Sequence, residues 1–599
     1  MTAPNRNTLW AEVLVDELVA AGVDAVCLAP GSRSTPLTVA FARHDDVRTY
    51  SHLDERSAAF FALGRGRATG RPTPLVCTSG TAAANFHPAV LEATESEVPL
   101  LLLTADRPPE LRDSGANQTT DQEKLYGDAV RWYRTLPEPA PDARKLRSLR
   151  VTAARAVAAS TGTPPGPVHL NVPFRKPLEP TKRPGDVPAE LGETDPVAVD
   201  GRDGPFVAWS HGESHPPDPA VRELREAVES TTRGLIVCGP ADRPTPGRAS
   251  LGRLADATGF PVLADPLSGH RFGPHLADAV VCGGYDSYLG ATAAVPAPEL
   301  VVRFGASPTS KPLRTFLAGV DARGVLVDPA GGWPEAEFRA TDLIESDPDQ
   351  FVTALLRGME KSSGREYRAL FEQREREYWE HVEAACESLR AADADGGGDS
   401  EELFEGAVVR EVSQRCPDGT ALFVSNSMPV RDLDRFGEPR TASIDVFGNR
   451  GVSGIDGITS TALGVGSARD GPLVLLIGDI AFYHDMNGLL ALQRCDVDAT
   501  IVVLNNDGGG IFHKLPIESF DPPFTEQFLT PHGLDFEPTG ELYGFPFERY
   551  GTLPSFADAF EEAVNGGGTQ VLSVRIDSER SHRARERLQE EIVDSLGSD

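Results

Sequence analysis

Lysine is scarce in this chain of 599 residues, which has 57 lysine and arginine residues together but only seven lysines. Acidic residues number 89, so the formal net charge is −32. A surface this acidic repels nucleic acid and anionic lipid, which excludes both as main binding partners. Few lysines, with acids spread along the whole chain, favour a protein from a salt-rich cytoplasm over one that is acidic by chance.

Long hydrophobic runs and paired cysteines are also missing. No run reaches about 18 consecutive apolar residues, which excludes a membrane-spanning helix. The first residues, MTAPNRNTLWAEV, lack the basic region and apolar run of a secretory signal. The seven cysteines are odd in number and form no CxxC pair. We therefore expect no zinc site, no disulfide framework, reduced thiols and a cytoplasmic location.

Short apolar runs alternate with helical patterns along most of the chain. Single hydrophobic cores stop growing near 250–300 residues, roughly, so a chain of this length needs several domains. Alternation of this kind favours parallel sheets covered by helices on both faces. The predicted strands are residues 25–29, 75–78, 100–104, 235–238, 262–264, 279–282, 301–304, 325–327, 421–424, 473–477, 500–504 and 571–576. The fold class that we predict is α/β, with three doubly wound domains.

Two stretches have the composition of linkers. One, residues 177–219, is rich in proline, glycine and acids, and the other is AADADGGGDSEE at 391–402. We place the domains at 1–185, 205–370 and 400–599.

The middle domain lacks a phosphate-binding turn. Its first predicted strand ends in CGPADRPTPG, without the G-x-G-x-x-G of dinucleotide-binding folds. We expect a Rossmann-like domain with a structural role.

Polar residues follow two neighbouring strands of the third domain. Gly478 and Asp479 end one strand, and Asn505 and Asn506 end the next. Since parallel strands share one carboxyl edge, these side chains should face one crevice. Either pair alone would usually be a turn. Together they supply oxygen ligands suited to Mg²⁺ bound with phosphates, and the nearby glycines allow close backbone approach to a diphosphate.

This spacing resembles the thiamine-diphosphate-binding motif. The resemblance implies that Asp479, Asn506 and the carbonyl of Gly508 hold Mg²⁺, or Mn²⁺ in its place, against the cofactor's diphosphate, beside Gly478. It also implies a glutamate that hydrogen-bonds the cofactor's aminopyrimidine, and Glu55 is the candidate.

The first domain contains the other cofactor residues that the resemblance implies. Apart from the resemblance, Glu55 would be interpreted as an acid at the N-terminus of a helix, stabilised by the helix dipole. The segment TSGTAAANFHPAV, with Ser79 and Gly80, is similar to the family's pyrimidine-side loop.

Six runs narrow the resemblance to one family of thiamine enzymes. They are APGSRSTPL (29–37), HLDERSAAF (52–60), TSGTAAANFHPAV (78–90), LTADRPPELRDSGANQTTDQ (103–122), SNSMPVRD (425–432) and NRGVSGIDGITSTALGVG (449–466). The chain resembles the 2-succinyl-5-enolpyruvyl-6-hydroxy-3-cyclohexene-1-carboxylate synthases of menaquinone biosynthesis. The resemblance implies decarboxylation of 2-oxoglutarate and addition of the remaining unit to isochorismate. It also implies self-association, as a homodimer or homotetramer, with active sites at a dimer interface.

Both implied substrates are dicarboxylates, so the site needs fixed positive charge, and arginine offers carboxylates a two-pronged partner. The resemblance implies that Arg33, Arg107 and Gln118 face isochorismate and act in catalysis, as does Glu55. The resemblance implies that further residues bind substrate: Ser32, Asn117, Lys311, Ser427, Arg431, Arg450, Phe512 and Leu515. It also implies that Ile455 bends the cofactor.

One position departs from the family pattern. Pro312 follows Lys311 where a second basic residue is common, and Arg314 is the possible replacement. Two other interpretations stay open: another thiamine-diphosphate 2-oxoacid lyase or decarboxylase, and a non-catalytic member of the fold.

The net charge yields a prediction about salt. The Debye length is about 3 Å at 1 M salt and about 10 Å at 0.1 M, so dilution exposes the carboxylates to one another. We expect both melting temperature and activity to fall when salt is lowered from molar concentrations to about 0.1 M. Full activity and an unchanged melting temperature in dilute buffer would show that the acidic surface is incidental.

Overall fold

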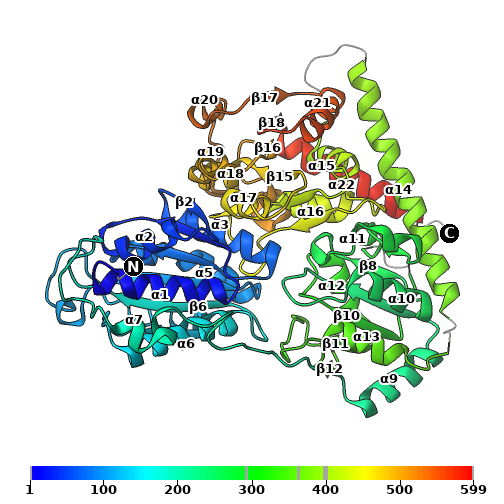
Figure 1. Ribbon diagram of the computed structural model, residues 1–599. Coiled ribbons are helices and arrows are strands. Elements are labelled where there is room, and N and C mark those ends of the chain that lie inside the picture. Colours follow the sequence, from blue (N-terminus) through cyan, green and yellow to red (C-terminus); the bar gives the residue numbers. More distant parts are fainter. Residues whose placement is uncertain (1–2, 291–294, 361–363, 395–402, 597–599) are drawn as a thin grey trace. The chain divides into compact units, whose positions relative to one another are not determined.

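The strands form three six-stranded parallel sheets (Figure 1). The computed structural model describes residues 3–290, 295–360, 364–394 and 403–596. Every ladder within these sheets is parallel. The predicted fold class, α/β with three doubly wound sheets, is confirmed.

The strands of the three sheets follow one another along the chain. The first sheet contains β1 (Ala25–Ala29), β2 (Arg48–Ser51), β3 (Thr73–Cys77), β4 (Leu100–Asp106), β5 (Trp132–Thr135) and β6 (Pro167–Pro173). The second contains β7 (Gly234–Cys238), β8 (Val262–Ala264), β9 (Val281–Cys282), β10 (Leu300–Phe304), β11 (Arg323–Val327) and β12 (Asp342–Ile344). The third contains β13 (Ala421–Val424), β14 (Asp445–Phe447), β15 (Leu473–Gly478), β16 (Thr500–Asn505), β17 (Phe547–Tyr550) and β18 (Gln570–Arg575).

Helices lie between successive strands. Those near the first sheet include α1 (Arg6–Ala20), α3 (Glu55–Thr69), α5 (His87–Glu95), α6 (Ala143–Ser160) and α17 (Ile458–Gly466). Those in the middle and C-terminal regions include α9 (Asp218–Ser230), α10 (Arg248–Thr258), α12 (Lys311–Gly319), α13 (Pro348–Leu356), α14 (Arg365–Ala394), α15 (Glu405–Arg415), α16 (Met428–Phe436), α18 (Asp479–His484), α21 (Leu553–Gly566) and α22 (Ser578–Leu596).

Contacts divide the chain into two compact units. Unit 1 contains Met1–Gly212, Asn449–Asp470 and Asp485–Val497, and unit 2 contains the rest. The first sheet belongs to unit 1, and the other two belong to unit 2. The segment with Arg450 and Ile455 therefore packs with the N-terminal sheet, although it follows β14 in the chain. The predicted domain ranges stay predictions.

The first and third sheets share one strand order. They run β2-β1-β3-β4-β6-β5 and β14-β13-β15-β16-β18-β17. In such a sheet the order reverses between two central strands, and ligands bind in the crevice beyond their carboxyl ends. These switch points lie between β1 and β3 in unit 1, and between β13 and β15 in unit 2.

The middle sheet has the Rossmann order, but its switch point is closed. The order is β12-β11-β10-β7-β8-β9, with the reversal between β7 and β10. A Cβ on Gly239, after β7, would lie 1.7 Å from the carbonyl oxygen of Ala306, which follows β10. Backbone therefore occupies the place where a nucleotide would sit, which supports the predicted structural role.

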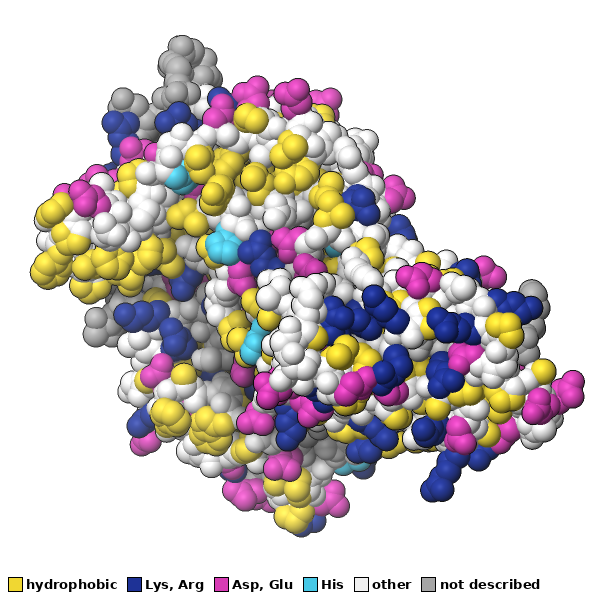
Figure 2. Space-filling view, turned by 90° about the vertical axis from the view of Figure 1, so that its left-hand side faces the viewer, with side chains coloured by type: hydrophobic (Ala, Val, Ile, Leu, Met, Phe, Trp, Pro, Cys, Tyr) yellow, Lys and Arg dark blue, Asp and Glu magenta, His cyan; other side chains and the backbone are white. Residues whose placement is uncertain are grey.

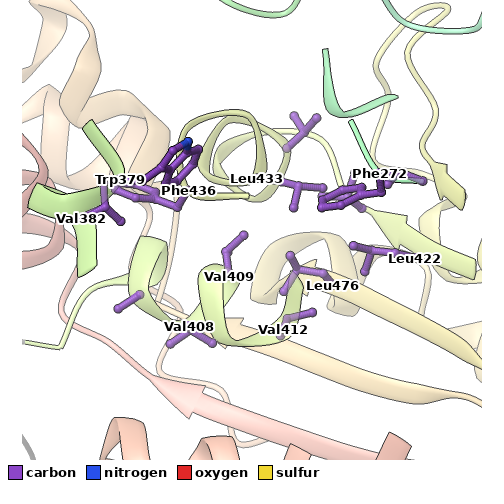
Figure 3. Packing of buried hydrophobic residues seen from close by; sticks show 14 of the residues in the cluster. Phe272, Trp379, Val382, Val408, Val409, Val412, Leu422, Leu433, Phe436 and Leu476 are labelled. Carbon is purple, nitrogen blue, oxygen red and sulfur yellow. The ribbon is translucent and has the colours of Figure 1, made fainter. Parts of the chain in front are cut away.

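Each unit has its own apolar core. Unit 1 packs α1, α6 and the strands of the first sheet around Trp10, Phe41 and Phe174. In unit 2 one cluster joins parts of both sheets, and Figure 3 shows Leu433 and Phe436 of α16 among its residues. This packing holds α16, which follows the end of β13, against the third sheet.

Two helices of unit 1 cross with almost no space between their backbones. A Cβ on Gly64 of α3 would lie 2.0 Å from the Thr461 carbonyl oxygen, and one on Gly464 of α17 would lie 2.1 Å from the Phe61 carbonyl oxygen. Only glycine fits at such distances. This crossing fixes α3, which begins at Glu55, against α17.

Several elements differ from the predictions. The strands β2, β5, β6, β12, β14 and β17 were not predicted. The predicted linker 177–219 partly packs on unit 1, because Leu178, Leu191 and Ala198 are buried in its core. The second predicted linker begins within α14, which ends at Ala394, and 395–402 lie outside the described residues.

Charged side chains are mixed on the visible surface, and the cysteines lie inside. Figure 2 shows acidic side chains dispersed among basic and apolar ones over the visible face, not gathered in one block. All seven cysteines are buried and free. Among the described residues, none of the helices combines the length and apolar character that crossing a membrane requires.

The glycine crossing predicts the effect of a single methyl group. Gly464→Ala would press a side chain into the backbone of α3, so we expect a loss of about 1–3 kcal/mol of stability. Thermal unfolding at fixed molar salt measures it. Gly566→Ala in α21 is the control, since a Cβ there would meet nothing within 4 Å. Equal melting temperatures for both variants would refute the tight crossing.

Candidate active site

In unit 1 the loops after β1 and β3 meet at the switch point. The backbone N–H of Arg33 donates to Thr78 Oγ1 over 3.2 Å. A Cβ on Gly31 would lie 2.6 Å from Thr78 Cβ, so glycine permits the contact. Ser32 and Arg33, predicted from the first loop, thus lie next to the loop that leads to Ser79.

Arg33 and Arg107, both predicted, lie close together here, and neither is paired with a carboxylate of the described residues. Arg33 is 5% exposed, and its Nη1 donates to the Phe174 carbonyl over 2.7 Å. Burial and the nearby charge of Arg107 lower the pKa of Arg33. Neither arginine forms an ion pair with another described residue. Two close guanidinium groups with this little compensation favour an anionic ligand.

Arg107 and Gln118 are connected to the second loop. Arg107 Nε donates to the Gln118 carbonyl over 3.2 Å, and Ser79 Oγ donates to the same carbonyl over 3.0 Å. In return, Gln118 Nε2 donates to the Ser79 carbonyl over 3.1 Å. Gly80, with φ of 91°, donates its N–H to Gln122 Oε1 over 3.0 Å. Asn117 lies on the exposed side of this segment.

Glu55 begins α3, whose N-terminus is capped by Asp54. Asp54 Oδ1 accepts from the backbone N–H of Arg56 over 2.8 Å. The half-buried Glu55 carboxylate has no hydrogen-bond or ion-pair partner among the residues that the structure describes. The pKa of Cys77 is raised mainly by burial and next by the charge of Glu55. The Glu55 carboxylate therefore lies close to the end of β3. A carboxyl group here is available to a ligand.

The segment with Arg450 is anchored by a buried glutamate. Glu92, in α5, is 1% exposed, and its two carboxylate oxygens accept from the N–H groups of Gly451 and Val452, each over 2.8 Å. A Cβ on Gly451 would lie 2.8 Å from the Glu92 carbonyl oxygen. Arg450 is fixed through its neighbours, and Ile455 lies in the same stretch before α17.

In unit 2, Asp479 faces the glycine loop after β16. Asp479 is 2% exposed, and its Oδ2 accepts from the Gly508 N–H over 3.1 Å. His532 Nε2 lies 3.3 Å from the same oxygen. Burial raises the pKa of Asp479 despite these partners, and a cation beside it would offset this burial cost. The backbone at Gly478 is open, since a Cβ there would meet nothing within 4 Å.

Asn506 presents an oxygen without a partner. Its Nδ2 donates to Glu405 Oε1 over 2.5 Å, whereas its buried Oδ1 has no hydrogen-bond partner among the described residues. Buried polar atoms without partners are rare, and one explanation for such an atom is that it binds an ion. The structure thus supplies a carboxylate, an amide oxygen and a backbone carbonyl, the hard oxygen donors that Mg²⁺ and Mn²⁺ prefer.

The loop after β13 adds the predicted Ser427 and Arg431. Ser427 has φ of 71°, and Arg431 Nη1 donates to its carbonyl over 2.6 Å. A left-handed φ at a non-glycine residue costs about 1–3 kcal/mol and is concentrated at functional sites. Phe512 stacks edge-on with Phe528 at 5.4 Å, and the side chain of Leu515 is 46% exposed.

Two cavities border these residues within unit 2. One, of about 700 Å³, lies at the ends of β16, β17 and β18 and is lined by Asn506, Arg549, Arg575 and Asp577 among others. The exposed Lys311 lines a second cavity of about 390 Å³ on α12. Arg314, the predicted replacement for the base lost at Pro312, lies 3.9 Å from Glu337.

Sequence reasoning missed several residues that hold this site. Gln122, Glu405 and His532 contact the predicted residues Gly80, Asn506 and Asp479 from elsewhere in the chain, and Glu92 holds the two residues that follow Arg450. Glu405 lies 101 residues from Asn506. It follows shortly after an acid-rich stretch, so nothing in the sequence distinguishes it from the neighbouring acids. Among the described residues, groups of three or more His, Cys, Asp or Glu side chains that could hold a metal do not occur, so a search for such clusters would also miss the site.

Comparison with known proteins gives consistent matches. Residues 9–125 match the model of the thiamine pyrophosphate enzyme N-terminal TPP binding domain, and residues 441–574 match that of the C-terminal TPP binding domain. Three relatives are named 2-succinyl-5-enolpyruvyl-6-hydroxy-3-cyclohexene-1-carboxylate synthase. Those of Haloarcula marismortui and Halorubrum lacusprofundi are 60% and 56% identical over 100% of both chains. That of Roseiflexus sp. is 47% identical over 96% of each.

A solved structure supports the fold. The benzoylformate decarboxylase of Polynucleobacter necessarius superposes with a TM-score of 0.68 over 96% of this chain and 99% of its own, at 18% identity. At this identity the likeness concerns the fold alone.

Proposed function

The chain belongs to the family of 2-succinyl-5-enolpyruvyl-6-hydroxy-3-cyclohexene-1-carboxylate synthases, which are thiamine-diphosphate enzymes, and from this premise we propose how its residues divide the work. The substrates are 2-oxoglutarate, which loses CO₂, and isochorismate, which receives the remaining four-carbon unit. The observation that carries the proposal is that most of the predicted residues lie on loops at the carboxyl ends of strands in the two like-ordered sheets.

Asp479, Asn506 through its Oδ1, and the carbonyl of Gly508 hold the divalent metal. The partnerless Oδ1 of Asn506 and the buried carboxylate of Asp479 support this assignment. Gly478, with open space above its backbone, and the loop with Ser79 and Gly80 border the cofactor. When bound, thiamine diphosphate would supply the thiazolium ring that takes up the electron pair left behind as CO₂ departs.

Glu55 holds a proton against the aminopyrimidine of the cofactor. Support comes from its half-buried carboxylate at the start of α3, which lacks a partner among the described residues. A carboxyl group in this place donates or accepts one proton as required. Ile455 supplies the apolar surface that keeps the cofactor bent.

Arginines recognise the carboxylates of both substrates. Arg33 and Arg107, close together and short of carboxylate partners, would bind isochorismate with Gln118, Ser32 and Asn117. The set for the succinyl end is Ser427, Arg431 and Arg450, with Phe512 and Leu515 providing apolar walls and Lys311 an additional charge.

The chain self-associates, and a second copy completes each site. Unit 1 exposes Leu53 and Val452, at 72% and 51%, directly beside Glu55 and Arg450. Exposed apolar side chains that border functional residues are typical of surfaces that another molecule covers. The assembly that we propose is a homodimer or a homotetramer.

One reaction mixture tests the assigned activity. The chain at molar salt is incubated with 2-oxoglutarate, isochorismate, thiamine diphosphate and Mg²⁺, and the products are analysed by mass. We expect the succinylated adduct only when both substrates are present. Turnover of pyruvate without any adduct would indicate a different thiamine lyase, and no reaction at all would indicate a non-catalytic member.

Replacing Glu55 separates catalysis from binding. Glu55→Gln retains size but cannot exchange a proton, so we expect cofactor binding to persist while adduct formation falls about 10²–10⁴-fold. Calorimetric titration with thiamine diphosphate and the mass assay measure the two effects. Glu95→Gln, at the end of α5, is the matched control and should leave both unchanged. Near-normal activity of Glu55→Gln would contradict the role.

A further inference from the structure

We propose that Glu405 is a positioning residue that decides which end of the Asn506 amide faces the metal. The inference rests on the proposed metal site and concerns a residue outside the predicted set. It starts from the unequal ends of one side chain. The oxygen of an amide can bind a cation, whereas its NH₂ group carries only donors and would repel one.

The Glu405 carboxylate selects the orientation. An ionised carboxylate only accepts hydrogen bonds, so it can pair with the Nδ2 end of Asn506 and not with the Oδ1 end. The Nδ2 to Oε1 distance is 2.5 Å. Since the amide is planar, pairing at one end leaves Oδ1 on the opposite side, buried and without a partner among the described residues.

Glu405 is itself held from three directions. It is 2% exposed, and Ser581 Oγ accepts from its backbone N–H over 3.2 Å and donates to its Oε2 over 3.1 Å. The guanidinium of Arg585 donates to the same Oε2. Oε1 is thereby directed at Asn506, while Oε2 is engaged with α22. Such fixed partners give the carboxylate one orientation.

The same guanidinium continues to α16. Arg585 Nε and Nη2 donate to the two oxygens of Asp432, each over 2.8 Å. Asp432 precedes Leu433 in the core and follows Arg431, which we assign to substrate. Glu405 and Asp432 thus share one guanidinium, which links the start of α15 to α16.

A glutamine at position 405 would reverse the pairing. Arg585 has only donors, so it would take the oxygen of the new amide and leave its NH₂ group facing Asn506. Asn506 would then turn its own oxygen toward that NH₂ and present Nδ2 to the metal. The shape of the site would be retained while its ligand is lost.

The test measures metal binding without turnover. Mn²⁺ is titrated into the full chain with thiamine diphosphate, and free Mn²⁺ is followed by electron paramagnetic resonance. We expect Glu405→Gln to weaken Mn²⁺ binding about 10–100-fold, the usual effect of removing a residue that orients a metal ligand. Asp432→Asn is the matched control, because it alters the same Arg585 cluster but leaves the Glu405–Asn506 pair intact, and its Mn²⁺ affinity should stay near that of the unaltered chain.

A double variant provides the sharper test and an alternative if Glu405→Gln fails to fold. In E405Q/N506D the carboxylate introduced at 506 has two equivalent oxygens, so it accepts from the new amide with one and binds the metal with the other. The net charge is that of the unaltered chain. We expect the double variant to recover tight Mn²⁺ binding, whereas equally weak binding in both variants would overturn the inference.

The remaining outcomes are also decisive. If the unaltered chain binds no Mn²⁺ with thiamine diphosphate, the proposed metal site fails, and the inference fails with it. If the unaltered chain and Glu405→Gln bind Mn²⁺ equally, the metal site stands and the positioning role of Glu405 is refuted. The adduct assay is independent of both results, so failure of the proposed function is recognised separately.

Discussion

The buried guanidinium of Arg585 connects α22 to the two helices of unit 2, α15 and α16, that border the proposed site. Arg585, Glu405 and Asp432 are 5%, 2% and 1% exposed. Removing one partner from such a buried pair costs about 3–5 kcal/mol, because the other charge is left uncompensated. Through this contact the C-terminal helix α22 holds both the start of α15, which contacts Asn506, and α16, which contains Arg431. The proposed metal loop and the arginine that we assign to substrate are thus both connected to this buried ion pair.

The repeated strand order fits the proposal, in which most of the assigned residues follow strands of two of the three sheets. In the first and third sheets the loops at the switch points contain residues assigned to the site, such as Arg33 after β1 and Ser427 after β13. In the middle sheet Gly239 brings backbone into the equivalent place. Under the proposal, one layer architecture thus provides two binding edges and one structural sheet, and the structural sheet differs by the close backbone approach at Gly239.

Much of this arrangement could be predicted from the sequence, because buried parallel strands are continuous apolar runs. The bounds of β1, β8 and β13 match their predictions. β6 was missed although it is fully buried, because His169 and Asn171 interrupt its apolar run. Both find partners only in the folded sheet, where Thr104 Oγ1 lies 2.7 Å from His169 Nε2 and 3.0 Å from Asn171 Oδ1. The missed edge strands, such as β2 and β17, are short and partly exposed.

The site, like the strands, could be predicted only in part. Strand-end residues such as Asp479 and Asn506 were predictable because parallel register brings them to one edge. Glu405 and Glu92 were not, since Glu405 contacts a partner 101 residues away and Glu92 contacts partners 359 and 360 residues away. Nothing local distinguishes them from the many other acids of this chain. Sequence patterns identify which atoms meet the ligand, whereas the residues that orient those atoms depend on tertiary packing.

One measurement tests the central claim most directly: a crystal structure of the chain with Mn²⁺ and thiamine diphosphate, with the metal located by its anomalous scattering. The account predicts Mn²⁺ bound by Asp479, Asn506 Oδ1 and the Gly508 carbonyl, while Asn506 Nδ2 keeps its hydrogen bond to Glu405. Metal held by other residues, or Asn506 turned with its oxygen toward Glu405, would contradict it.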